Sequence, residues 1–172
     1  SWAAAQHGDL PSLVFKDQTF SHTEVEARSN RMAHALIRLG LQPGERIAVL
    51  LENSVESVDS VFGADKAALT YVALNARHTL AEHLAILANA QVSAVLLGAQ
   101  FEGIGQALAL RDPHQLPDLK HILSLGFAGQ GIQPLEPLLA HASDTAPAIE
   151  VGPAHIARIA YTSGTTGQPK GV

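Results

Sequence analysis

The residues best suited to chemistry lie in one stretch near the end of the chain, residues 159–171, which read IAYTSGTTGQPKG. An apolar segment leads into a loop with three glycines, three threonines, one serine, one lysine and no acidic residue. Glycines let the backbone approach a ligand closely and turn its amides inward. The hydroxyl groups add donors, and Lys170 supplies a compact positive charge that suits a phosphate. The pattern predicts an anion site; the alternative is an exposed polar turn.

Two well-known phosphate-binding motifs do not fit this loop. A Walker A loop requires Gly-Lys-Ser/Thr, whereas Pro169 precedes Lys170 and Gly171 follows it. The spacing of Gly164 and Gly167 also does not match the G-x-G-x-x-G fingerprint of dinucleotide-binding folds. The loop therefore belongs to neither of these classes.

The segments that must position this loop alternate between strands and helices. Residues 47–51 form an uninterrupted apolar run, which is typical of a parallel strand that is buried on both faces. We also predict strands at 70–74, 94–97, 120–125 and 156–162, and helices at 22–39, 55–68, 79–90 and 101–110. This alternation predicts an α/β fold, a layered subdomain with a mostly parallel sheet and flanking helices.

Local signals mark where the helices begin and end. Ser21 with Glu24, and Thr79 with Glu82, have the spacing of a capping box, in which the two side chains satisfy each other's backbone amides. Gly40 follows the first of these helices at the place where a left-handed residue ends a helix.

We expect four parts along the chain. These are a hairpin and helix at 13–40, α/β units at 45–125, a connection at 126–154, and a strand with the phosphate loop at 155–172. The glycines and prolines of the connection predict a long surface segment with one helical turn around 136–141. Because the chain begins without Met and stops directly after its glycine-rich motif, we expect a fragment of a longer protein.

The composition excludes several classes of function. Of the 172 residues 47% are hydrophobic and 16% are charged, which argues against a disordered chain. The net charge of −5 does not favour nucleic-acid binding, and zero cysteines exclude disulfides, thiolate metal sites and a cysteine nucleophile. There is no apolar run of membrane-spanning length and no secretory signal pattern. We therefore expect a cytoplasmic protein without a membrane span; the sequence indicates no oligomeric state.

Residues 161–172 resemble the phosphate-loop signature of the adenylate-forming (AMP-binding) superfamily, which includes acyl-CoA synthetases, peptide-synthetase adenylation domains and firefly luciferase. Residues 43–49 resemble its P-G-D-R-V-A-V segment, residues 52–56 its N-S-x-E helix start, and residues 71–77 its Y-V-P-L-N-x-R strand. The resemblance covers nearly the whole chain and is weakest between about 100 and 154. It is greatest to acyl-CoA synthetases, of which this chain corresponds to the N-terminal portion.

The resemblance implies an ATP-dependent, AMP-forming carboxylate–CoA ligase, an acyl-CoA synthetase with a role in fatty acid metabolism. Such an enzyme activates a carboxylate with Mg-ATP, releases pyrophosphate and passes the acyl group from the acyl-adenylate to CoA. The ligand of Mg²⁺ is expected outside this chain, and no metal ligand is assigned within it. By position, the residues assigned to the ATP phosphates are Thr162, Ser163, Gly164, Thr165, Thr166, Gly167 and Lys170. Lys170 is assigned the catalytic role.

The segment Asn75-Ala76-Arg77 favours CoA ligases over amino-acid-activating domains, which more often carry an aspartate there. In some ligases this arginine approaches the CoA nucleotide, so the resemblance assigns Arg77 to CoA. The alternative for Arg77 is a surface or helix-capping charge. Two other readings of the whole chain stay open: an adenylation domain that loads a carrier protein, and a truncated, non-catalytic association module. The sequence does not define which carboxylate is used, and we expect the chain alone to be inactive.

Some residues depart from the family's pattern. Ala68 stands where the family usually has glycine, Ala73 where it has proline, and Asp65 at a commonly apolar place. These departures bear on local packing more than on chemistry.

Other polar residues suggest no further site. The nine histidines are scattered, and His78 and His83 lack the spacing of a helical zinc pair, so we expect solvated surface histidines. Glu56 and Asp59 lie three apart on a predicted helix, and we expect them to form a solvated face.

Overall fold

The computed structural model describes residues 1–162 and 170–172, in which strands and helices alternate. The α-helices are α1 (Trp2–His7), α2 (His22–Arg38), α3 (Val55–Lys66), α4 (Leu80–Asn89), α5 (Glu102–Ala109) and α6 (Glu136–Ala140). The strands are β1 (Pro11–Phe15), β2 (Gln18–Ser21), β3 (Arg46–Leu50), β4 (Thr70–Ala73), β5 (Ala94–Gly98), β6 (His121–Leu125), β7 (Gln133–Pro134), β8 (Arg158–Ile159), β9 (Tyr161–Thr162) and β10 (Lys170–Gly171). Short 3₁₀ turns lie at Ala99–Phe101 and Pro113–Gln115. In this part of the chain we find no helix with the length and hydropathy needed to cross a membrane.

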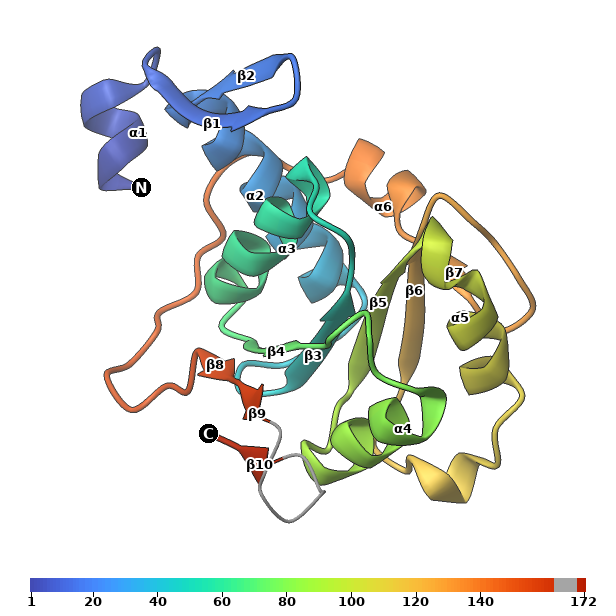
Figure 1. Cartoon of the computed structure of the whole chain (residues 1–172). Helices are drawn as coiled ribbons and strands as arrows, with labels where there is room; N and C mark the ends of the chain where they lie inside the picture. The colour runs from blue at the N-terminus through green and yellow to red at the C-terminus, as the bar shows by residue number, and fades with distance from the viewer. Residues whose placement is uncertain (163–169) are drawn as a thin grey trace.

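A six-stranded sheet forms the centre of the molecule, with the strand order β7-β6-β5-β3-β4-β8 (Figure 1). Every neighbouring pair in this sheet is parallel, which confirms the predicted α/β fold with a mostly parallel sheet. Two antiparallel pairs lie outside it, the β1–β2 hairpin and the β9–β10 pair.

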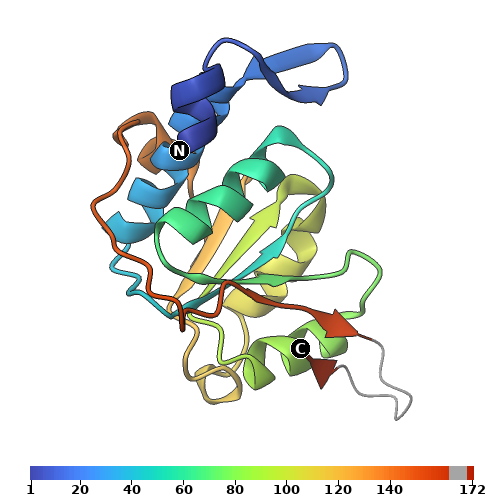
Figure 2. The same ribbon diagram turned by 90° about the vertical axis from the view of Figure 1, so that its left-hand side faces the viewer.

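Helices cover both faces of the sheet, so the structure has three layers. Figure 2 shows α2 and α3 on one face and α4 and α5 on the other. Ile47 and Val49 of β3 pack with the α2–α3 side, whereas Ala48 and Leu50 pack with the α4–α5 side. Successive side chains of a strand point to opposite faces, so a strand buried on both sides must be apolar throughout.

The contact between α2 and α3 is close because a glycine lies in it. A Cβ atom on Gly63 would lie 2.3 Å from Cγ of Met32. Glycine is the one residue that permits this backbone approach, and both Met32 and Gly63 are buried.

The predicted capping boxes are present. The hydroxyl of Ser21 accepts from the amide of Glu24, whose carboxylate accepts from the amide of Ser21. Thr79 and Glu82 make the same pair of bonds at the start of α4. Gly40, after α2, has a φ of 85°, as its predicted role requires.

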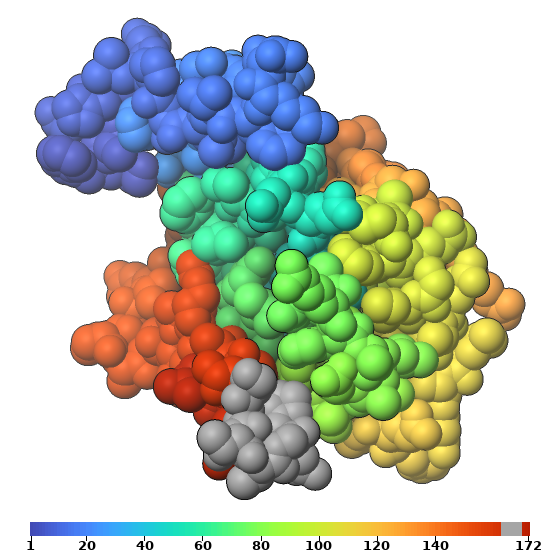
Figure 3. Space-filling model, viewed as in Figure 1, coloured from blue at the N-terminus to red at the C-terminus, as the bar shows by residue number. Residues whose placement is uncertain are grey.

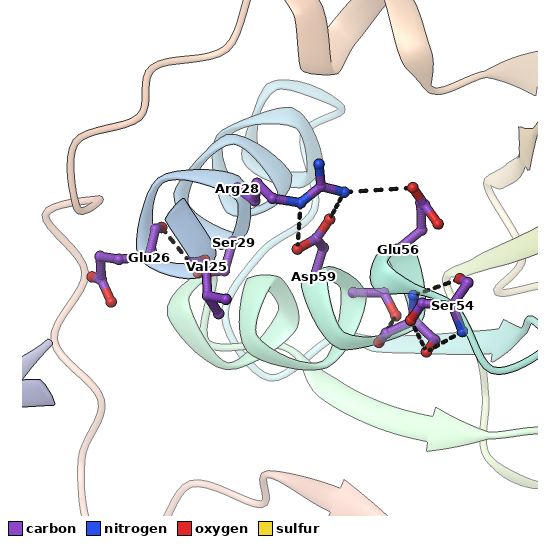
Figure 4. A network of polar contacts seen from close by, with 9 residues as sticks. Val25, Glu26, Arg28, Ser29, Ser54, Glu56 and Asp59 are labelled. Carbon is purple, nitrogen blue, oxygen red and sulfur yellow. Dashed lines mark hydrogen bonds and ion pairs between the residues drawn. The ribbon is translucent and has the colours of Figure 1, made fainter. Parts of the chain in front are cut away.

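A polar network joins α2 to α3 (Figure 4). Nη2 of Arg28 lies 2.6 Å from Oδ2 of Asp59 and 3.4 Å from Oε1 of Glu56. The expected solvated face is wrong for Asp59, which is only 5% exposed. Burial raises the pKa of Asp59, although the hydrogen bonds and charge of Arg28 act in the opposite direction. The spacing of two acids within one helix could not indicate an arginine that lies 31 residues away.

The single strand predicted at 156–162 is wrong, because the structure has two short strands there, β8 and β9. Arg158 and Ile159 pair with β4 in the central sheet, whereas Tyr161 and Thr162 pair with β10 outside it. The chain changes partner at Ala160, whose N–H and C=O both bond to Val172. An apolar pattern reports burial and does not show which neighbour a strand pairs with.

The connection at 126–154 contributes more to the fold than its composition indicated. It contains β7, which extends the edge of the sheet next to β6, and α6, which agrees with the helical turn predicted around 136–141 and ends one residue earlier. Ile132 and Leu135 are buried at 7% and 0% exposure, so part of this segment belongs to the core.

Candidate functional site

The carboxyl ends of the parallel strands define the edge of the sheet where a ligand site is expected. From β3 the chain passes to β4 on one side and then to β5 on the other, so the order reverses between β3 and β5. In open α/β sheets ligands bind outside the carboxyl ends at such a reversal. A cavity of about 520 Å³ opens there, lined in part by Gly98, the last residue of β5, and by residues that follow β3 and β5: Leu51, Glu52, Asn53, Ser54, Ala99 and Gln100.

The predicted loop begins and ends at this same edge. Because β8 runs parallel to β4, the chain that leaves β8 emerges beyond the carboxyl end of the sheet. Figure 2 shows β9 and β10 on the same side of the molecule as the loop that follows β4. In Figure 3 the residues of β8–β10 lie at the periphery, away from the β1–β2 hairpin.

The β9–β10 pair brings together two of the predicted phosphate-binding residues. Thr162 and Lys170 are directly opposite each other in the antiparallel register. Ala160 and Val172 exchange two backbone hydrogen bonds of 2.9 Å just outside them. Opposed residues in such a pair have Cα atoms about 4.5–5.5 Å apart. The exposed hydroxyl of Thr162 and the exposed ammonium of Lys170 can therefore approach one anionic group.

Five other predicted phosphate-binding residues lie outside the described residues. They are Ser163, Gly164, Thr165, Thr166 and Gly167. Their assignment stays a prediction from the sequence.

Tyr161 connects this pair to α4. Its hydroxyl donates to Oδ1 of Asn89 at 2.5 Å, and burial raises the pKa of the phenol. A Cβ atom on Gly171 would lie 3.1 Å from Cζ of Tyr161 and 3.1 Å from Cγ2 of Ile159. Glycine at 171 thus leaves room for the tyrosine ring beside β10.

A second connection, which the sequence analysis missed, holds β8. Arg158 forms a two-point ion pair with Asp65 of α3; one of its two hydrogen bonds joins Nη2 to Oδ2 at 2.7 Å. The guanidinium also lies 5.3 Å from the ring centroid of Tyr71 in β4. Hydrogen bonding to Asp65 raises the pKa of Arg158. The sequence offered one indication of this ion pair: Asp65 is an acid at a position where members of the resembled family commonly have an apolar residue.

Arg77 lies in the loop that follows β4, at the same edge of the sheet. It is exposed, and its backbone N–H donates to Oδ1 of Asn75 at 2.9 Å. The side-chain cap of α4 comes from Thr79. The structure therefore does not use the Arg77 side chain as the helix cap, and it leaves the guanidinium in a position open to solvent.

The histidines near this loop are not all at the surface, which corrects the expectation for His83. His83 is 0% exposed, and its ring centroid lies 5.8 Å from that of His78. Burial, and to a smaller extent the charge of His78, lowers the pKa of His83. His83 is three and four residues before the buried Ile86 and Leu87, so it lies on the inner face of α4. Within residues 1–162 and 170–172 no three His, Cys, Asp or Glu side chains gather as metal ligands.

Comparisons with known proteins agree on one family. The family described as AMP-binding enzyme matches residues 1–172. The crotonobetaine/carnitine–CoA ligase of Salmonella typhi is 33% identical over 180 residues, which cover 98% of this chain and 34% of the ligase. Malpinin synthetase of Mortierella alpina is 32% identical over 164 residues, 95% of this chain and 2% of the synthetase.

A solved structure gives the same result for the fold. The inhibitor-bound N-terminal domain of FACL13 from Mycobacterium tuberculosis superimposes with a TM-score of 0.87 at 31% identity. The match covers 99% of this chain and 42% of that domain structure. The chain spans about a third of the length of the curated CoA ligase that it matches.

Proposed function

Since the chain belongs to the AMP-binding enzyme family, we propose that its full-length protein is an ATP-dependent, AMP-forming carboxylate–CoA ligase. The observation that carries the proposal is the β9–β10 pair, which sets Lys170 opposite Thr162 at the carboxyl edge of the sheet. A CoA ligase among the relatives, similar over 98% of this chain, supports the same reaction class.

The proposed reaction has two steps. A carboxylate oxygen attacks the α-phosphorus of ATP, a new P–O bond forms, and the bond to pyrophosphate breaks. The thiol of CoA then attacks the carbonyl carbon of the acyl-adenylate, loses its proton, and AMP leaves with the former carboxylate oxygen. The thiol of the second step belongs to CoA; these 172 residues contain no cysteine.

In the first step Lys170 and Thr162 act on the departing pyrophosphate. Negative charge builds on its oxygens as the bond to the α-phosphorus breaks, and donors already in place stabilise that charge. A hydrogen bond to a charged group contributes about 1.5–3 kcal/mol, which corresponds to roughly a ten- to hundredfold change in rate. We assign Lys170 the catalytic role on this basis, with the residues of 163–167 as further phosphate contacts.

Magnesium would accompany ATP in this reaction. We assign no step through the metal to the described residues and propose that its protein ligand lies outside this chain.

Arg77 is proposed to contact the nucleotide portion of CoA. Its guanidinium is exposed at the same edge of the sheet as the loop, and planar guanidinium groups suit phosphate oxygens. Exchange of Arg77 for alanine then raises the KM for CoA and leaves the adenylation half-reaction unchanged.

The proposal is tested by pyrophosphate exchange in the full-length protein. The Lys170→Ala variant is expected to lose roughly ten- to hundredfold in carboxylate-dependent ATP–pyrophosphate exchange. Arg38→Ala, which removes an exposed cation in the last turn of α2, is the matched control and is expected to keep full exchange. Equal activity of Lys170→Ala and Arg38→Ala would remove Lys170 from the mechanism.

A second candidate for the full-length protein is an adenylation domain that loads a carrier protein. Malpinin synthetase, one of the relatives, is a much longer protein, of which this chain covers 2%. Incubation of the full-length protein with ATP, a carboxylate, and either free CoA or a phosphopantetheinylated carrier separates the two candidates. Thioester formed only on the carrier would replace the ligase proposal.

A further inference from the structure

Strand β8 is a short edge strand that needs anchoring beyond its backbone pairing. It consists of Arg158 and Ile159, and both pair with β4 on one side only. The amide of Tyr71 donates to the carbonyl oxygen of Ala157 at 2.9 Å. The hydroxyl of Thr70 donates to the carbonyl oxygen of Ile156 at 2.6 Å. These bonds set the register but leave the outer side of β8 without a strand among the described residues.

The side chain of Arg158 supplies a second anchor from a different layer. Its guanidinium meets both carboxylate oxygens of Asp65 on α3 and lies over the ring of Tyr71. A two-point contact of this kind fixes the direction of a guanidinium as well as its position. Asp65 and Arg158 are 93 residues apart in the sequence, so the pair joins the last strand of the sheet to its covering helix.

The anchored strand lies a few residues before the proposed phosphate-binding residues. Arg158 and Ile159 form β8, Tyr161 and Thr162 form β9 one residue later, and Lys170 lies opposite Thr162. The chain leaves the sheet after Ile159, so nothing in the sheet itself holds Thr162. Strand β9 is held by its pairing with β10 and by the Tyr161–Asn89 hydrogen bond.

We propose that Asp65 and Arg158 are positioning residues, which act through β8 to place Thr162 and Lys170 for the phosphates of ATP. This inference rests on the function proposed above. The side chains of Arg158 and Asp65 are 40% and 36% exposed, and exposed ion pairs contribute little to global stability. Loss of the pair should therefore move the strand without unfolding the protein, which makes the two effects separable.

The test uses a double-mutant cycle in the full-length protein with the variants Asp65→Asn, Arg158→Gln and their combination. Asp144→Asn is the matched control, since it breaks an exposed Arg–Asp pair with Arg31 that lies away from β8. The first readout is hydrogen–deuterium exchange at the amides of Tyr71 and Ala160. The second readout is the KM for ATP and for the carboxylate in pyrophosphate exchange.

We expect amide exchange at Tyr71 and Ala160 to become about fivefold faster in each single variant. The KM for ATP should rise about fivefold, while the KM for the carboxylate stays within twofold. The double variant should be no worse than either single variant, because one shared interaction has been removed. Asp144→Asn should change none of these values, and Arg158→Lys, which keeps the charge without the two-point contact, should lie in between.

Several results would overturn the inference. Unchanged amide exchange in Asp65→Asn would show that the pair does not hold β8. Faster exchange with an unchanged KM for ATP would refute the positioning role, and additive effects in the cycle would show that the two residues act separately. A lower kcat with both KM values unchanged would indicate a smaller folded fraction, hence a structural role alone. If the unmodified protein exchanges no pyrophosphate, the proposed function fails, and amide exchange still decides whether the pair anchors the strand.

Discussion

Replacement of His83 by leucine is expected to stabilise the protein. His83 is fully buried, and among the described residues neither of its ring nitrogens has a hydrogen-bond partner. A buried polar group without a partner costs about 1–3 kcal/mol. Leucine has a similar volume and matches the apolar neighbours Ile86 and Leu87 on the same face of α4. We therefore expect His83→Leu to raise the free energy of unfolding by about 1–3 kcal/mol at pH 8.

The gain should grow as the pH falls. Burial and the charge of His78 lower the pKa of His83, while Glu82 raises it to a smaller extent. The unfolded chain takes up a proton near the ordinary histidine pKa of about 6.5, and the folded chain resists it, so wild-type stability falls below that pH. At about pH 5.5 this contribution is at most about 1.4 kcal/mol. The His83→Leu variant lacks this imidazole, so it does not lose this stability when the pH falls.

Urea unfolding of both proteins at pH 8 and pH 5.5 measures the two effects. His114→Leu is the control, since His114 is exposed and its replacement should change stability by less than about 0.5 kcal/mol. A His83→Leu variant that is less stable than wild type at pH 8 would refute the unsatisfied-histidine argument. A gain that is equal at both pH values would refute the assigned pKa direction.

Two further stability predictions concern the interface between α2 and α3. Arg28→Met leaves the buried carboxylate of Asp59 without its partner, and we expect the free energy of unfolding in urea to fall by about 2 kcal/mol. The loss is smaller than for a fully buried pair because the Arg28 side chain is 32% exposed. Adding Asp59→Leu should recover most of that loss; no recovery would contradict the pairing. Gly63→Ala forces the new methyl group into a methionine of α2, so we expect a loss of about 1–3 kcal/mol. Gly103→Ala lies in helix α5, where nothing is within 4 Å of the new Cβ, so this variant should instead gain up to about 1 kcal/mol in free energy of unfolding. If both glycine variants lost stability, or both gained it, the close-approach argument would be contradicted.

The features that the sequence predicted best are those that depend on neighbouring residues. The capping boxes at Ser21 and Thr79 formed because each needs only residues three positions apart. The strand at 47–51 was visible because burial on both faces demands an unbroken apolar run. Its parallel pairing followed from the helices between the strands.

The features that the sequence missed depend on distant partners or very short elements. The burial of Asp59 requires Arg28 on another helix, and the Asp65–Arg158 pair spans 93 residues. Strands of two residues, such as β7 and β8, leave no periodicity to read. The burial of His83 was different, because its spacing from Ile86 and Leu87 was available in the sequence.

The chemistry of the site stays a prediction from the sequence, and the sequence did not indicate which elements support it. The composition of the loop indicates a phosphate site, and the structure sets Thr162 opposite Lys170. The sequence could not show that β9 leaves the central sheet, because an apolar run of the same pattern continues across Ala160. The anchors of the site, Arg158 and Tyr161, therefore became visible only in the structure.

Ala68 illustrates why a departure from the family's pattern need not disturb the fold. The family usually has glycine at this position, and the structure explains the preference, since Ala68 has a φ of 53°. A left-handed alanine costs about 1–2 kcal/mol. Glycine would relieve that cost but would lose a buried methyl group, about 0.8 kcal/mol, and gain freedom in the unfolded chain, about 0.4–1 kcal/mol. Ala68 is 2% exposed, so the methyl contribution applies in full. The opposing terms nearly cancel, and for this reason the sheet and the site can form with either residue.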